Sequence, residues 1–147
     1  MAKAASFWQA VNYRGSYQIF ASDGILFNHE SPLRPANFVE KKIASAACRI
    51  ARGSKEHLYR GDLLIERGWG CTPEYVEAMR LMLQLQEPDK LLMATGTSNK
   101  LAEFVDYAFT QLVLEWQDHV VIDPELFRPT DLSSSKGNLE EAEKLFG

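Results

Sequence analysis

Three short apolar runs alternate with amphipathic segments along this chain, and that alternation restricts the fold more than any other feature. The first run is Ile25-Leu26-Phe27, and the later ones lie within 91–95 and 119–122. Apolar residues at consecutive positions suit strands that are covered on both faces, as in the parallel sheets of α/β proteins. Because helical periodicity separates the runs, the sequence predicts the α/β fold class.

Amphipathic periodicity predicts five helices that separate or flank these runs. We expect helices over 2–14, 37–52, 73–84, 98–112 and 138–146. Gly15-Ser16 is expected to end the first helix. Asn37 and Asn138 are each followed three residues later by a glutamate, the spacing of a capping box that opens a helix. Thr72 is expected to cap the third helix, with Pro73 in its first position.

The apolar spacing also predicts which helix faces are buried. In the second helix the expected stripe is Val39, Ile43, Ala46, Ala47 and Ile50. In the third helix it is Val76, Met79 and Leu83. Cys48 shares its helix with several alanines, so we expect a small buried hydrophobe rather than a nucleophile. A strand pair is expected at 57–59 and 63–67, with Gly61-Asp62 turning between the strands.

Composition narrows the classes of function. The 147 residues suit one domain with a sizeable core. The formal net charge of -4 argues against non-specific nucleic-acid binding. The two cysteines form no CxxC pair, the three histidines have no metal-ligand spacing, and no apolar run is long enough to span a bilayer. We therefore expect a reduced, cytoplasmic protein without a metal, nucleic-acid or membrane partner.

Polar side chains follow the first strand directly. Asn28, His29 and Glu30 come where the strand of 24–28 ends. Ligands of open α/β sheets bind at the carboxyl ends of strands, so these side chains indicate a site. The alternative interpretation makes His29 a loop histidine that is hydrogen-bonded to a backbone carbonyl. From the residues alone, the two interpretations are equally good.

Several motifs resemble one family of nucleotide-sugar enzymes. They are LFNHESP, NFVEKKI, GWGCTPEYVEAMRLML, MATG, LAEFVDYAF and DPELFRPTDL. Together they resemble the C-terminal half of the GDP-mannose 4,6-dehydratases, which are NADP-dependent lyases of the extended short-chain dehydrogenase/reductase superfamily. The resemblance covers essentially all 147 residues.

The resemblance implies an architecture and a reaction. Residues 1–28 would be the end of the NADP-binding Rossmann domain, an incomplete sheet edge, and 29–147 the small α/β region that binds the nucleotide sugar. The family converts GDP-mannose into GDP-4-dehydro-6-deoxymannose and water through internal NADP redox and elimination. Its Gly-rich loop and its catalytic tyrosine, threonine or serine, and glutamate fall outside this chain. The chain alone is therefore expected to be inactive.

The resemblance also assigns roles to individual residues. Lys3 matches the catalytic lysine that binds the nicotinamide ribose and lowers the pKa of the tyrosine. His29 and Arg34 match residues that contact NADP. The matches to substrate-binding positions are Asn28, Val39, Lys42, Asp62, Arg67 and Arg128. Cations are what a diphosphate requires, and arginine can hold two of its oxygens at once.

Three positions depart from the family pattern, and one of them is Gly68, where the family often has an aspartate after the match to Arg67. Leu33 stands where the family usually has an arginine, in a loop that reaches a neighbouring subunit's cofactor in several members. Asp62 stands where an asparagine is common, and its carboxylate would bond a ribose hydroxyl but repel phosphate. These departures weaken the expectation of an intact NADP and substrate site.

Three functional hypotheses remain open. The chain is part of a split dehydratase that works with a separately encoded N-terminal half, a free-standing module that binds GDP or a GDP-sugar, or a degenerate remnant. A different nucleotide-sugar epimerase or reductase is a weaker alternative, against which the Asn28–Pro32 block speaks. We also expect a poorly soluble chain or a homo-oligomer, because the apolar strand 25–27 would keep an uncovered edge.

Overall fold

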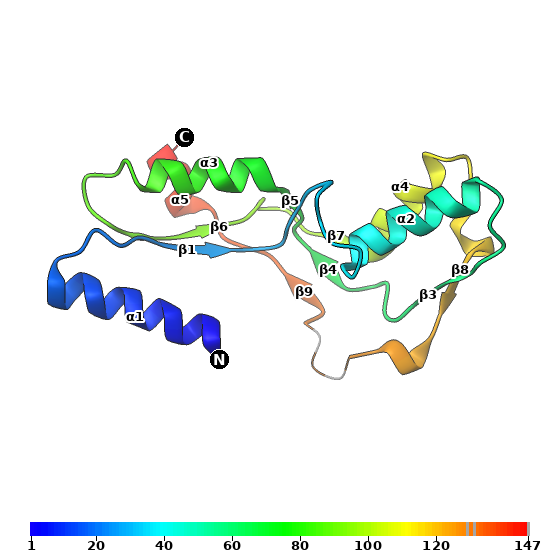
Figure 1. Cartoon of the computed structure of the whole chain (residues 1–147), viewed down its shortest axis with the longest axis horizontal. Coiled ribbons are helices and arrows are strands. Elements are labelled where there is room, and N and C mark those ends of the chain that lie inside the picture. The colour runs from blue at the N-terminus through cyan, green and yellow to red at the C-terminus, as the bar shows by residue number, and fades with distance from the viewer. Residues whose placement is uncertain (129, 131, 147) are drawn as a thin grey trace. The chain divides into compact units, whose positions relative to one another are not determined.

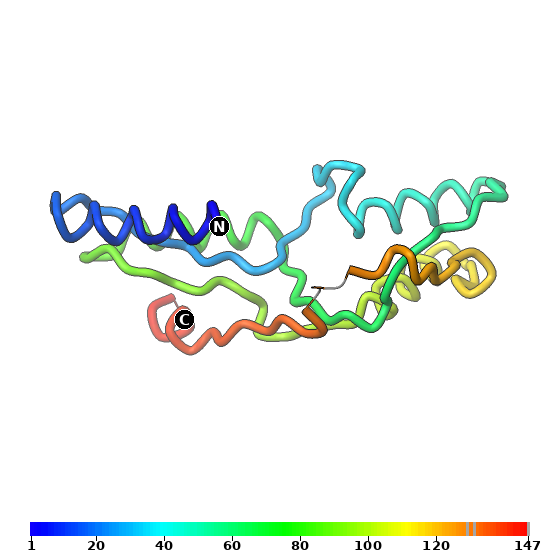
Figure 2. The backbone as a smooth tube through the Cα atoms, turned by 90° about the horizontal axis from the view of Figure 1, so that it is seen from below, coloured from blue at the N-terminus to red at the C-terminus, as the bar shows by residue number. Residues whose placement is uncertain are grey.

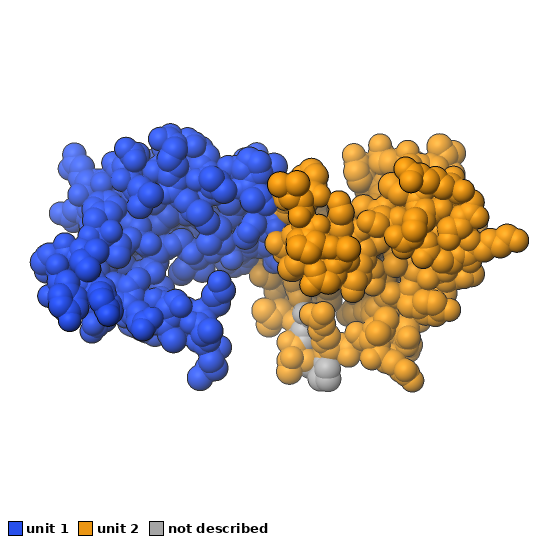
Figure 3. Space-filling model, viewed as in Figure 1, with its two compact units in different colours: residues 1–29, 69–96, 137–147 blue, residues 30–68, 97–136 orange. Residues whose placement is uncertain are grey.

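The computed structural model describes residues 1–128, 130 and 132–146. The chain divides into two compact units, shown in different colours in Figure 3. Unit 1 comprises 1–29, 69–96 and 137–147, and unit 2 comprises 30–68 and 97–136. The chain therefore passes between the units repeatedly, and each unit is assembled from segments that are distant in sequence.

Unit 1 is built around two parallel strands. Strand β1 (Asp23–Leu26) pairs with β6 (Lys90–Met93), with Gly24 opposite Leu91. Its other elements are α1 (Ala2–Tyr17), β5 (Gly70–Cys71), α3 (Thr72–Met82) and α5 (Glu140–Phe146). Figure 2 shows α1 and α5 on opposite sides of the β1–β6 pair. The short strand β2 (His29–Glu30) pairs with β5.

The core of unit 1 lies between α3 and the strands. Its buried members are Tyr75, Met82, Leu91 and Met93. Each is at most 5% exposed, so α3 turns the face containing Tyr75 towards the sheet. The predicted stripe of α3 is wrong, because Val76, Met79 and Leu83 are exposed. Residues one position away from the predicted ones form the contact instead, and the helix begins at Thr72 with Cys71 as its N-cap.

The first helix and the first strand are both less buried than expected. Helix α1 runs through Gly15 to Tyr17, and its C-cap Gln18 has a left-handed φ of 54°, so the predicted break at Gly15-Ser16 is wrong. None of its residues is buried, and its Arg14 pairs with Asp23 of β1 at 2.7 Å. Within the described chain β1 pairs with β6 alone, which leaves Ile25 44% exposed. The burial predicted for this apolar run is therefore incomplete at Ile25.

Unit 2 packs two helices against each other. They are α2 (Val39–Ala51) and α4 (Leu101–Thr110). The buried side chains of α2 are Glu40, Ile43, Ala46, Ala47 and Ile50, and those of α4 are Leu101, Val105 and Phe109. Four of the five residues predicted for the α2 stripe are therefore confirmed. Cys48 is exposed, which corrects its predicted burial, because it lies on the solvent side of α2.

Short strands complete unit 2. Strand β3 (Leu58–Arg60) pairs in parallel with β8 (Val120–Ile122). A second sheet has the order β7-β4-β9, from Asn99–Lys100, Glu66–Arg67 and Ser134–Ser135. The 3-10 turns η1 (Trp116–Asp118) and η2 (Pro124–Leu126) flank β8. Figure 1 shows β3 beside β8 and β4 beside β7 and β9.

Two local predictions for unit 2 are wrong. The segments around 57–59 and 63–67 form strands β3 and β4, but these strands pair with β8 and with β7 and β9, not with each other. Helix α2 begins one residue after Phe38, which is its N-cap and makes no side-chain capping bond. The Asn37 capping box is therefore absent, and Glu40 is buried instead. At α5, Asn138 Oδ1 accepts a hydrogen bond from Glu140 N, the first residue of the helix, so Asn138 contacts the start of α5 from two residues before it.

Candidate functional site

A cavity of about 440 Å³ lies in unit 2. Its walls come from the start of α2, the end of β3 with the turn that follows it, the start of α4 and the segment after η2. We call it the unit 2 cavity. Gly61 allows two of these walls to approach, because a Cβ at this position would lie 2.7 Å from the Leu126 carbonyl oxygen.

Four of the six predicted substrate residues line this cavity. They are Val39, Lys42, Asp62 and Arg128. Val39 is the first residue of α2, and Lys42 lies one turn further on. Asp62 Oδ1 accepts a hydrogen bond from Leu64 N at 2.7 Å, which holds the turn after β3. Arg128 is exposed in the segment after η2.

Arg60 of β3 also lines the cavity, although the sequence analysis did not single it out. Its Nη1 donates to the Tyr59 carbonyl oxygen at 3.1 Å, whereas its Nε and Nη2 are buried without a hydrogen-bond partner. Burial lowers the pKa of the Arg60 guanidinium. In the sequence, only its place directly before the Gly61-Asp62 turn could have drawn attention to it.

The charges of the cavity favour an anion. Among the described residues that line it, Lys42, Arg60 and Arg128 are cationic and Asp62 is the single carboxylate. The N-terminal end of α2 also borders the cavity through Asn37 and Val39, and the positive end of a helix dipole favours negative charge. An anionic group that contacts these cations would therefore be stabilised, provided that it keeps away from Asp62.

Arg67 does not line the unit 2 cavity. It belongs to β4, and its Nη1 donates to the carbonyl oxygens of Glu66 and Leu132, both at 2.7 Å. The bond to Leu132 fastens β4 to the segment that leads into β9. The structure therefore places one predicted substrate residue in a structural contact.

Asn28 and His29 lie at the end of β1, as predicted. The Asn28 carbonyl oxygen accepts from Gly70 N at 3.0 Å and from the Tyr75 hydroxyl at 3.4 Å. His29 Nδ1 is 3.0 Å from the Phe27 carbonyl oxygen. The backbone hydrogen bond that we expected of His29 as a loop histidine is therefore present. Because a carbonyl only accepts, Nδ1 carries the proton, and Nε2 of the neutral ring is left as an acceptor.

The other predicted cofactor residues have different surroundings. Lys3 is exposed near the start of α1. Arg34 pairs with Glu30 at 3.2 Å and lies 3.8 Å from the centroid of the Phe38 ring. The side chain of Leu33 is 92% exposed. The Arg34 guanidinium therefore has contacts at Nη2 and with the Phe38 ring, whereas its Nε is buried without a hydrogen-bond partner.

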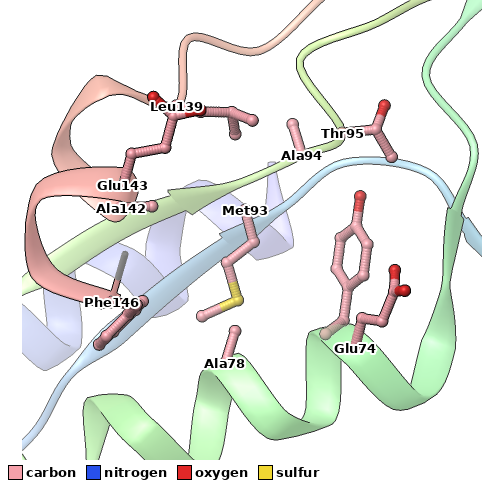
Figure 4. Close-up of a pocket in the computed structure, with 10 residues that line it drawn as sticks. Glu74, Ala78, Met93, Ala94, Thr95, Leu139, Ala142, Glu143 and Phe146 are labelled. Carbon is pink, nitrogen blue, oxygen red and sulfur yellow. The ribbon is translucent and has the colours of Figure 1, made fainter.

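Unit 1 contains a second cavity, of about 370 Å³. It lies between α3, β6 and α5, and most of its lining is apolar. Figure 4 shows the Met93 side chain extending towards Ala78, with Phe146 to one side of them and Glu74 and Thr95 to the other. Burial, and secondarily the nearby Glu74 carboxylate, raise the pKa of Tyr75, which also lines this cavity. The cavity lacks the cations that characterise the one in unit 2.

In the part of the chain that the structure describes, no helix has both the length and the apolarity needed to cross a bilayer. Over the same residues, no three histidine, cysteine or acidic side chains gather closely enough to hold a metal ion.

Comparison with known sequences gives a consistent result. The family model described as GDP-mannose 4,6 dehydratase matches residues 1–147. GDP-mannose 4,6 dehydratase 1 of Arabidopsis thaliana is 46% identical over 145 residues, which is 99% of this chain and 40% of that protein. The human GDP-mannose 4,6 dehydratase is 38% identical over an alignment that covers 97% of this chain and 43% of the human protein. The chain spans less than half the length of these relatives.

Comparison with solved structures supports the fold. RMD from Pseudomonas aeruginosa, complexed with NADPH, superposes with a TM-score of 0.81 at 17% identity, covering 93% of this chain and 44% of that one. The dTDP-glucose 4,6-dehydratase of Bacillus anthracis, in complex with NAD, has a TM-score of 0.80 at 20% identity, covering 97% and 43%. The predicted fold, the C-terminal part of an extended short-chain dehydrogenase/reductase, is confirmed.

Proposed function

Because the chain belongs to the GDP-mannose 4,6-dehydratase family, we propose that it is the substrate-binding part of such an enzyme and that the unit 2 cavity receives the GDP portion. The observation that carries this proposal is the meeting of Lys42 and Arg128, from distant segments, in one cavity with an excess of positive charge. A nucleoside diphosphate carries several negative charges and hydroxyl groups, which match arginine, lysine and a ribose-binding carboxylate.

The roles of the lining residues follow from their chemistry. Lys42 and Arg128 would neutralise the phosphates, and Arg128 would hold two oxygens at once. Asp62 would accept from a ribose hydroxyl with the oxygen that Leu64 N does not use. Val39 would supply apolar contact at the start of α2.

The family reaction needs a nicotinamide cofactor, and we propose NADP. When bound, that cofactor supplies the hydride acceptor and donor. An exposed ammonium at Lys3 and the Nε2 acceptor of His29 suit ribose and amide groups of such a molecule. Lys3 would position the ribose and favour the phenolate of a tyrosine that lies outside this chain.

Catalysis would require a second polypeptide or a longer chain. The reaction needs a base, an acid and a phosphate-binding glycine loop, and none of these is assigned to this chain by its resemblance to the family. We propose that a separately encoded N-terminal half supplies them. The described residues that line the unit 2 cavity belong to this chain, so we expect it to bind GDP without that half.

Calorimetric titration of the purified chain tests the proposal. GDP-mannose and GDP should bind, UDP should bind more weakly, and no GDP-mannose should be converted by the chain alone. A folded sample that binds none of these nucleotides would contradict the proposal and leave the degenerate remnant. Binding with no gain of activity from any added N-terminal half would favour a free-standing GDP-sugar binding module.

A further inference from the structure

Arg60 lies where two cavities of unit 2 adjoin. Besides the unit 2 cavity, it lines a neighbouring space of about 350 Å³. Lys42 is the other residue that both spaces share. Among the side chains that line either space, these two could therefore serve a ligand that extends from one into the other.

The guanidinium of Arg60 is poorly satisfied in the chain by itself. Its Nε and Nη2 atoms are shielded from solvent and have no hydrogen-bond partner, and Nη1 bonds only the Tyr59 carbonyl oxygen. Burial without a compensating carboxylate lowers the pKa of Arg60. A buried donor without an acceptor costs stability, and a charged donor costs more than a neutral one.

Arg60 is unusual among the described residues of unit 2 in having two buried nitrogen donors without an acceptor. Arg49, which lines the neighbouring space, grips Glu56 with Nε at 2.7 Å and Nη2 at 3.1 Å. Arg34 pairs with Glu30 through Nη2, and only its Nε is also buried without a partner. In the described chain the carboxylate nearest in sequence, Asp62, uses Oδ1 to accept from Leu64 N. Arg60 therefore keeps two donors available for a group that comes from outside the chain.

We propose that Arg60 is a further ligand of the diphosphate and that, together with Lys42, it binds phosphate oxygens where the two spaces adjoin. This inference rests on the proposed function. The entering oxygens would accept from Nε and Nη2, the two donors that lie on one side of the guanidinium and suit bidentate binding. The long side chain must rotate to present them, since both atoms are shielded before the ligand arrives. Diphosphate binding would then give acceptors to the two buried donors of Arg60 and would also form an ion pair.

Titration of the full chain and of Arg60→Met with GDP, guanosine and pyrophosphate tests this inference. Methionine removes the charge and fills similar apolar space. GDP and pyrophosphate should each bind roughly 10- to 100-fold more weakly, the effect of losing a hydrogen bond to a charged group. Guanosine binding should be unchanged. Arg49→Met is the matched control, because Arg49 lines the neighbouring space but is already paired, and it should bind GDP as the parent chain does.

Thermal unfolding of the same variants separates ligation from a structural role. If Arg60 mainly serves the ligand, Arg60→Met should unfold at or above the temperature of the parent chain. A clear fall in that temperature, with GDP affinity intact, would overturn the inference and leave the proposed function standing. If pyrophosphate binds through Arg60 but GDP does not bind, the inference holds for phosphate and the proposed function fails. If neither anion binds the folded parent chain, both are overturned.

Discussion

The Tyr75 hydroxyl donates to the Asn28 carbonyl oxygen at 3.4 Å, and so ties α3 to the end of β1. The same carbonyl accepts from Gly70 N, while the Tyr75 ring lies 5.0 Å from the ring of His29. Gly70 permits this arrangement, because a Cβ there would clash with the Tyr75 ring. The polar end of β1 is therefore held in place by one buried aromatic side chain.

Tyr75→Phe should destabilise the chain modestly. The variant loses one long hydrogen bond but keeps the ring in the core, so the free energy of unfolding should fall by about 0.5–1.5 kcal/mol. Urea unfolding followed by circular dichroism measures the change. Tyr107→Phe, at a side chain that is 64% exposed, is the control and should have no effect. Equal stability of the Tyr75 variant and the parent chain would show that the bond to Asn28 contributes nothing.

The raised pKa of Tyr75 also predicts that the free energy of unfolding depends on pH in the alkaline range. Burial first, and then Glu74, raise the pKa of Tyr75 above its usual value of 10.0. The folded state therefore keeps this proton longer than the unfolded state does. The contribution is fully present below the unfolded pKa and is lost as pH rises from there through the folded pKa. Urea titrations across this range should show a decline in stability that is shallower in Tyr75→Phe.

Gly61→Ala should widen the unit 2 cavity at the cost of stability. The new Cβ would meet the Leu126 carbonyl oxygen, which belongs to the backbone and cannot rotate away. We expect a loss of about 1–3 kcal/mol in the free energy of unfolding and weaker GDP binding. Gly15→Ala is the control, because nothing lies within 4 Å of its Cβ position in α1. It should instead gain about 0.5–1 kcal/mol.

Arg128→Ala should abolish measurable GDP binding by the isolated chain. The residue is exposed, so folding should be unaffected, whereas a charge-assisted contact to phosphate contributes about 1.5–3 kcal/mol. Calorimetry with GDP measures the effect, and Lys136→Ala, which changes an exposed cation outside the cavity, is the control. Unchanged affinity of the Arg128 variant would remove this residue from the site.

Val113→Asn should stabilise the chain. Val113 follows α4 with a φ of 59°, a left-handed conformation that costs a β-branched residue about 1–2 kcal/mol. Asparagine tolerates it better, and the valine side chain is 94% exposed, so little packing is lost. Val121→Asn, in strand β8, is the comparison and should lose stability in the same thermal unfolding experiment.

Self-association of the isolated chain remains a prediction. Unit 1 exposes Trp8, Tyr17 and Ile25, which are 66%, 66% and 44% accessible. Exposed apolar surface on this scale favours association or poor solubility. Light scattering at increasing concentration measures it, and a uniform monomer throughout would contradict the prediction. Trp8→Lys should raise solubility if α1 contributes to the association.

The sequence predicted local features better than long-range pairing. The stripe of α2 could be read because Ile43, Ala46 and Ile50 follow the helical period and are buried by a neighbouring helix. Helix α3 is apolar on more than one side, so its spacing did not decide between Val76 and Tyr75. The partners of β3 and β4 lie far along the chain, and no local pattern indicates them.

In the candidate site, too, the sequence predicted some residues and missed others. Motif resemblance led to Lys42, Asp62 and Arg128, which the fold brings to one cavity. It also led to Arg67, whose guanidinium is instead bonded to two backbone carbonyls. Arg60 belongs to no quoted motif, and its importance depends on burial and unpaired donors. Such properties arise from tertiary packing and cannot be read from the order of residues.

The interleaving of the two units limits how this protein can be dissected. Strand β1 meets β6 only after the whole first segment of unit 2, and β3 meets β8 only after the middle segment of unit 1. Pairings between such distant residues slow folding, because a long loop must close before they form. A single proteolytic cut or truncation therefore cannot release either unit intact. Engineering unit 2 as an independent fragment would require its two segments to be rejoined by new linkers.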